Sequence, residues 1–195
     1  MNNEESYPDR TQARNLLIDA VKCNPGPWGR HSIVTAQCAE KIAGKCGMNA
    51  EKAYILGLLH DIGRRYGKYH FRHISGGYYY MKELGYDTAA RICLTHSFPT
   101  HSFREYIGNF DDTQEVTEEL QSILAGICYD DYDSLIQLCD SLAGAEGVVS
   151  MEERMNDIKK RYGAYPVEKK EANRQLKQYF DDKCGEDVYQ VIKGL

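Results

Sequence analysis

The sequence predicts an all-α protein built as a single helical domain, and three observations carry this prediction. Apolar residues recur at helical intervals along most of the chain, whereas no segment of useful length alternates with period two between turn signals. The length of 195 residues suits one domain with one sizeable core. Apolar residues make up 42% and charged residues 27%, which is ordinary globular usage and excludes disordered and fibrous classes.

The helices of the first half follow from the turn and capping residues between apolar runs. Asn-Pro-Gly-Pro at residues 24–27 breaks the chain, Asn49 is a suitable N-cap, and Gly85 is a suitable C-cap. We therefore expect helices over residues 10–22, 28–45, 53–63, 71–84 and 87–97. The third of these is apolar on every side, which is typical of a buried helix.

The second half is expected to be helical after one loop. Residues 98–112 contain Pro, Gly and Asn and predict that loop, and a long helical stretch follows from Thr113 to a break near Gly147. Further helices are expected over residues 151–163, 167–180 and 186–193. The prediction is one domain over residues 1–195, with a core at about 28–145 and a helical extension at 146–195.

Charge and cysteine usage narrow the class of protein. The net charge of −5 and a pI near 5.7 argue against bulk nucleic acid as a partner, because phosphate binding needs a surplus of Lys and Arg. No apolar run is long enough to span a membrane, and the polar N-terminus does not resemble a secretory signal. The seven cysteines are odd in number and lack C-x-x-C spacing, which indicates reduced thiols and predicts a cytoplasmic location.

The pair His60-Asp61 is the sharpest local signal, because it ends the buried third helix. Adjacent polar residues are costly to bury unless something satisfies them. A metal ion would do so, since imidazole and carboxylate together suit Fe, Mn, Zn, Co or Ni. The alternative is a hydrogen-bonded helix end without an ion.

Other residues of metal-ligating type stand on separate apolar helices. Each is a lone His or Asp beside apolar neighbours, and a lone carboxylate in such a stretch needs a partner. They are His31, His73, His96 and Asp140. His73 is followed by Gly76 and Gly77 on the same helical face, where two missing side chains let another backbone come close. One shared ligand explains such a set better than four separate structural roles.

The ordered set of these residues resembles the HD-domain superfamily of metal-dependent phosphohydrolases. That family carries a His, then His-Asp, then a distant Asp on an all-helical core, and the resemblance covers about residues 28–145. A six-ligand subset adds two histidines and holds two metals. The resemblance therefore implies two divalent transition-metal ions, iron first and Mn, Zn, Co or Ni as alternatives. The implied ligands are His31, His60, Asp61, His73, His96 and Asp140.

A basic block follows the His-Asp pair, and it carries the expectation of phosphate binding. No acidic residue occurs between Asp61 and Glu83, yet Arg64 and Arg65 follow the pair closely, and arginine matches phosphate oxygens at two points. We expect both arginines to bind substrate and to assist catalysis. Further candidate substrate contacts are Lys68, His101 and Arg104, with His101 also a candidate general acid or extra ligand. A solvated basic surface is the alternative.

The residues after Asp140 are expected to have a plainer role. Arg154 and its acidic neighbours Glu152 and Glu153 could close a pocket, but they are more typical of a solvated helix surface. We expect them to coat a helix.

The predicted function is hydrolysis of a phosphate ester or anhydride in a small nucleotide-like molecule. The resemblance implies a hydroxide held by the metals as the attacking group, with Asp61 bridging the two ions. Arg64 or Arg65 would neutralise charge on the phosphoryl oxygens. Two other functions remain open: a di-iron oxygenase on the same fold, and a non-catalytic nucleotide-sensing module. The oligomeric state is not predicted.

Overall fold

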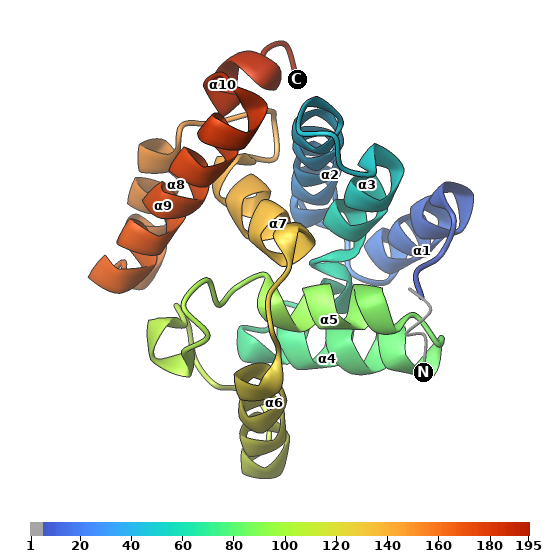
Figure 1. Ribbon diagram of the computed structural model, residues 1–195. Coiled ribbons are helices and arrows are strands. Elements are labelled where there is room, and N and C mark those ends of the chain that lie inside the picture. The colour runs from blue at the N-terminus through green and yellow to red at the C-terminus, as the bar shows by residue number, and fades with distance from the viewer. Residues whose placement is uncertain (1–5) are drawn as a thin grey trace.

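The computed structural model describes residues 6–195, and its regular secondary structure is helical (Figure 1). The α-helices are α1 (Arg10–Cys23), α2 (Trp28–Lys45), α3 (Ala50–Leu59), α4 (Phe71–Glu83), α5 (Asp87–Thr95), α6 (Gln114–Gly126), α7 (Asp131–Leu142), α8 (Met151–Tyr162), α9 (Val167–Cys184) and α10 (Val188–Val191). Two short 3-10 helices are η1 (Ile62–Tyr66) and η2 (Phe103–Glu105). Residues 6–195 contain no strand, and the all-α prediction is confirmed.

The helices are arranged around a central group of α2, α3 and α7 (Figure 1). Helix α1 packs against α3 and η1, and the pair α4 and α5 lies across the end of this group. Helices α8 and α9 lie beside α7 on the other side of the molecule. The His-Asp pair stands where α3 ends, so it faces the ends of several helices at once.

Two apolar clusters hold this arrangement together. The larger one contains buried side chains of α1, α2, α3, α5, α7 and the C-terminal helices, such as Ile42, Leu56 and Phe180. The smaller one joins α4, α5 and α6 through a group of aromatic rings that includes Phe71 and Phe98. In the described part of the chain, every helix is too short or too polar to cross a bilayer.

Several expected helix boundaries are wrong, among them the end of α9, which is Cys184 rather than residue 180, and two others bear on the site. The third helix ends at Leu59 rather than residue 63, because the chain turns at His60 and Asp61 into η1. The long helix expected from Thr113 is two helices, α6 and α7, separated by residues 127–130. Asp130 starts the second of them with a capping box, in which its carboxylate accepts from the backbone N–H of Asp133.

Candidate metal centre

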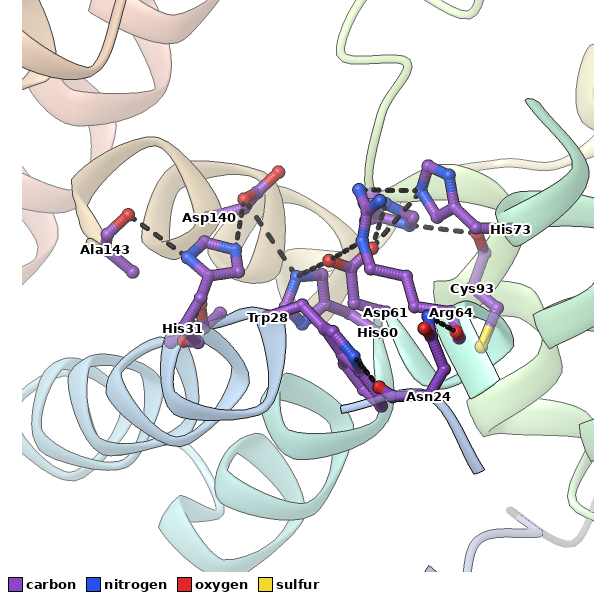
Figure 2. Close-up of polar contacts among 12 residues, drawn as sticks. Asn24, Trp28, His31, His60, Asp61, Arg64, His73, Cys93, Asp140 and Ala143 are labelled. Carbon is purple, nitrogen blue, oxygen red and sulfur yellow. Dashed lines mark hydrogen bonds and ion pairs between the residues drawn. The ribbon is translucent and has the colours of Figure 1, made fainter. Parts of the chain in front are cut away.

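Six side chains predicted as ligands converge from five helices into two adjoining groups. His31, His60 and Asp140 form the first group, and within it the potential ligand atoms lie within 4.8 Å of one another. Asp61, His73 and His96 form the second group, and their potential ligand atoms also lie within 4.8 Å of one another. We call these triad 1 and triad 2, and Figure 2 shows members of both facing the same space.

Triad 1 joins the ends of three helices of the central group. His31 lies in the first turn of α2, His60 follows the last residue of α3, and Asp140 lies in the last turn of α7. The His60 Nδ1 contacts the Gly57 carbonyl at 2.7 Å, and the His31 Nδ1 contacts the Ala143 carbonyl at 3.1 Å (Figure 2). These carbonyls are helix-end acceptors that lack a partner within their own helix.

Triad 2 joins the residue after α3 to the helices α4 and α5. His73 lies in the first turn of α4 and His96 follows the last residue of α5. The His96 Nδ1 contacts the Cys93 carbonyl at 2.9 Å, and the His73 Nδ1 contacts the His70 carbonyl. Three of the four imidazoles, those of His60, His73 and His96, are therefore held by a carbonyl three residues earlier.

A close backbone contact sets the distance between Asp61 and α4. A Cβ atom on Gly63 would overlap the His73 carbonyl oxygen and the amide of Gly77. This is the close approach that the glycines after His73 predict, and it presses η1 against α4. On its other side, η1 is held by Asn24, whose Nδ2 donates to the Arg64 carbonyl at 2.6 Å (Figure 2).

The carbonyl contacts fix the tautomer of all four imidazoles. A carbonyl oxygen only accepts hydrogen bonds, so each Nδ1 carries a proton, and Nε2 is the atom that presents a lone pair when the ring is neutral. Burial lowers the pKa of His31 and of His73, and burial together with His60 lowers the pKa of His96 to about 3. Neutral imidazoles with free Nε2 atoms are the form that binds metals.

The Nε2 atoms point towards carboxylate oxygens, which also accept hydrogen bonds and donate none. His31 Nε2 lies 2.9 Å and His60 Nε2 lies 3.9 Å from Asp140 Oδ1. His73 Nε2 lies 3.2 Å and His96 Nε2 lies 3.7 Å from Asp61 Oδ1. Lone pairs facing carboxylates repel one another unless a cation lies between them.

The Asp61 carboxylate has one oxygen that lacks a hydrogen-bond donor. Its Oδ1 is fully buried and accepts no hydrogen bond from the described residues. Its Oδ2 accepts from Arg64 Nε at 2.5 Å and lies 4.0 Å from His60 Nε2, so the two oxygens face different triads. Burial alone would raise the pKa of Asp61, but the Arg64 guanidinium, His73 and His60 hold it well below its usual range. The donor set thus fits divalent transition-metal ions.

The second carboxylate is ionised for similar reasons. Burial opposes the charge of Asp140, but the adjacent His31 imidazole and the charge of Arg154 keep its pKa well below the usual range. Both triads therefore combine one ionised carboxylate with two imidazoles.

The predicted substrate residues are not all close to this centre. A cavity is lined by all of triad 2 and by Asp140 of triad 1, and Arg64 lines it too, half-buried. Arg65 instead places its guanidinium 4.1 Å from the centre of the Tyr80 ring, outside the cavity.

The other three candidates also lie apart from the cavity. Lys68 and Arg104 are exposed, and His101 is exposed and stacked on Tyr129 with ring centroids 3.5 Å apart. Positive φ at His101 (58°) turns the loop there. In this structure the basic block therefore contributes one side chain, Arg64, to the cavity, because the 3-10 turn of η1 points its neighbours outward.

Sequence reasoning missed the residues on the opposite wall of the cavity. Helix α8 contributes Arg154, Ile158 and Arg161 to the lining, and Lys169 comes from α9. The expectation that Arg154 only coats a helix is wrong, since its Nη2 lies 3.4 Å from Asp140 Oδ1. The readable signal was the spacing of Arg154, Ile158 and Arg161, whose intervals of four and three place them on one helical face.

Together the fold and the centre define a class: an all-helical protein with a buried His/Asp site fit for divalent metals. The chain matches the family of the HD domain over residues 28–145, which is more than half of its length. The chain therefore belongs to the HD-domain family. No curated protein and no solved structure matches it.

Proposed function

We propose that this protein is a metal-dependent phosphohydrolase that acts on a small nucleotide-like phosphate ester or anhydride. HD domains are typically metal-dependent phosphohydrolases. The observation that carries the proposal is the convergence of four Nε2 atoms and two ionised carboxylates in two adjoining triads, four of whose side chains line a cavity. The proposed occupants are two divalent transition-metal ions, with iron as the first choice.

Each triad would hold one metal ion. His31, His60 and Asp140 would hold one ion, and His73, His96 and Asp61 the other. The Asp61 carboxylate would be the bridge, because its Oδ1 faces His73 and His96 and its Oδ2 faces His60. When bound, such ions polarise a phosphoryl oxygen and lower the pKa of a water towards neutrality.

Arg64 has two roles in this proposal. Its hydrogen bond to Asp61 keeps that carboxylate ionised and oriented, and its position in the cavity lining offers a cation to a phosphoryl oxygen. Support for a nucleotide-like substrate comes from Tyr69, Tyr106 and Tyr162, which line the cavity and offer ring faces to a base.

The experiment is a phosphate-release screen on protein loaded separately with Fe(II), Mn(II) or Zn(II). Nucleotides and sugar phosphates serve as substrates, and metal content is measured on the same preparations. We expect release of phosphate by at least one metal form. Asp61→Asn keeps the volume but removes the charge, so it should lose at least one ion per chain and about 1,000-fold in rate.

The matched control is Asp19→Asn, an exposed carboxylate on α1 that pairs with Lys22. It should keep the metal content and the rate of phosphate release of the wild type. Dioxygen uptake without phosphate release would contradict the proposal in favour of an oxygenase. Nucleotide binding without turnover in any metal form would contradict it in favour of a sensing module.

A further inference from the structure

The cavity has a second wall that the HD-domain match does not include. Helices α8 and α9 lie beyond residue 145, and three cationic side chains on them line the cavity opposite the triads. We call Arg154, Arg161 and Lys169 the cationic wall. The chain as a whole is acidic, yet these basic residues lie together at a site where bound metal ions would add further positive charge.

Two members of the cationic wall reach inward to the metal centre. The Arg154 Nη2 lies 3.4 Å from Asp140 Oδ1, while its Nε is buried and has no hydrogen-bond partner in the described part of the chain. Lys169 Nζ donates at 2.5 Å to the carbonyl of Ser97, the residue that follows His96. Both cations therefore lie within reach of a molecule bound at the triads.

The third member lies further out. Arg161 is 48% exposed and pairs with Asp157 on its own helix at 2.8 Å. It follows Arg154 by two helical turns, so the two arginines lie along one line that leads away from the metal centre. The wall thus extends from the ions towards the mouth of the cavity.

The turn between α8 and α9 is fixed by contacts that leave the wall free to meet a ligand. The buried Asn173 donates to the Tyr165 hydroxyl at 2.8 Å. On the outer side, Glu152 pairs with Lys170 at 3.2 Å and with Arg174 at 2.7 Å. Lys170 and Arg174 do not line the cavity. Lys170 can therefore serve as a control for Lys169, its neighbour in the chain.

The charge balance of the cavity decides the class of ligand. Of the lining residues, Arg64, Arg154 and Arg161 are cationic and Lys169 is a fourth basic side chain, whose pKa is lowered by burial, whereas Asp61 and Asp140 are anionic. Two divalent ions would add further positive charge. One phosphate monoester carries about two negative charges, which the ions and Arg64 alone would balance. The wall would then have no anion from the ligand, and its carboxylate partners are Asp140 for Arg154 and Asp157 for Arg161.

We propose that the cationic wall binds the further phosphoryl groups of a substrate that carries several of them in a chain, such as a nucleoside triphosphate. The group to be cleaved would lie at the triads, and the remaining groups would extend along Lys169, Arg154 and Arg161. This inference rests on the proposed hydrolase function and specifies its substrate class.

The test compares orthophosphate with tripolyphosphate as probes of the metal-loaded full chain, by calorimetric titration. Tripolyphosphate should bind wild type about tenfold more tightly than orthophosphate, because it reaches the wall. Lys169→Met and Arg161→Gln should each lower tripolyphosphate affinity about tenfold and leave orthophosphate affinity unchanged. Arg154 is left intact because it contacts Asp140. Metal content is measured after each titration, because polyphosphates also chelate metals.

Lys170→Met is the matched control, since it removes the same charge one position along α9, outside the cavity. An equal loss of affinity in Lys169→Met and Lys170→Met would overturn the proposal, because general surface charge would then explain binding. Equal wild-type affinity for the two probes would also overturn it.

Turnover of p-nitrophenyl phosphate by the same preparations separates this inference from the proposed function. Hydrolysis without preferential tripolyphosphate binding would overturn the wall alone. Wall-dependent tripolyphosphate binding, with no hydrolysis of p-nitrophenyl phosphate or of any nucleotide, would support the binding site and contradict the proposed hydrolase function.

Discussion

The two walls of the cavity are built in different ways. On the metal side, every ligand comes from helices within the HD-matched residues 28–145, and the four imidazoles are each held by a backbone carbonyl. On the opposite side, Arg154, Arg161 and Lys169 are half-buried or exposed on long flexible stems. Rigid ligands suit ions, whose coordination tolerates little displacement, whereas flexible cations can adapt to a substrate. The difference separates the site of chemistry from the site of recognition.

The largest effect should follow removal of the ions, which acts on the rigid wall alone. At about 100-fold excess of metal over Kd, each ion contributes about 2.7 kcal/mol, because it binds only the folded state. Chelation should therefore lower Tm by about 10–20 °C and abolish phosphate release. Differential scanning calorimetry before and after chelation measures this.

A histidine outside both triads gives the control for chelation. His101→Gln should show the same metal content and the same drop as wild type, because His101 stacks on Tyr129 away from the ligands. A Tm that chelation leaves unchanged would show that the rigid wall does not depend on metal.

A smaller effect should follow from changing the backbone contact that aligns the two triads. In Gly63→Ala the new methyl group would overlap the His73 carbonyl and the Gly77 amide, so η1 must move away from α4. We expect a loss of more than about 2 kcal/mol in the free energy of unfolding, measured by urea titration. Gly126→Ala, where nothing lies within 4 Å, should cost nothing. Equal stability of the two variants would contradict this close contact.

Acid should destabilise the metal-free protein through its buried histidines. His96 has a folded-state pKa of about 3 because of burial and the neighbouring His60, whereas the unfolded chain titrates near 6.5. Between these values only the unfolded chain takes up the proton, so stability falls as the pH drops from 6.5 towards 3. At pH 5 this should cost about 2 kcal/mol, or about 4–8 °C in Tm.

The pH prediction is tested by the Tm of chelated protein at pH 7 and pH 5. His96→Gln should show a smaller drop than wild type. Asp61 and Asp140 do not interfere, because carboxylates with lowered pKa lose their contribution only below the ordinary value near 3.8. Identical drops in wild type and variant would refute the assignment of His96 as a buried neutral imidazole.

The smallest effect should come from the flexible wall. Ser150 starts α8 with a capping box, so Ser150→Ala should cost about 1 kcal/mol, or about 2–4 °C in Tm. Metal content should not change, because α8 holds no ligand. Ser122→Ala on the exposed face of α6 is the control and should leave Tm unchanged. Loss of metal in the Ser150 variant would show that the two walls are not separate.

The ligands were predictable because each is a polar residue in an apolar helix. His60 and Asp61 at the end of α3, and Asp140 within α7, are visible as exceptions without knowledge of the fold. Their division into two triads was not, since it depends on which helix ends meet. The same limit applies to the break between α6 and α7: residues 127–130 hold no Gly or Pro, and the signals were Gly126 at the end of α6 and the capping carboxylate of Asp130.

The flexible wall could not be predicted, because its residues have an ordinary surface pattern. Arg154 and Arg161 stand among charged neighbours, and such helices usually coat a protein. Their role depends on how α8 packs beside α7, which local sequence does not encode. The basic block after Asp61 stood closer in sequence, yet the 3-10 turn brings only Arg64 into the cavity.

The most direct test of the central claim is the number of metal ions per chain in three proteins, measured by elemental analysis. Wild type should bind two ions. His31→Gln should lose the ion of triad 1 and His73→Gln that of triad 2, so each variant should retain one. Full metal content in both variants, or no bound transition metal in wild type after loading, would contradict the assignment of the two triads as a metal centre.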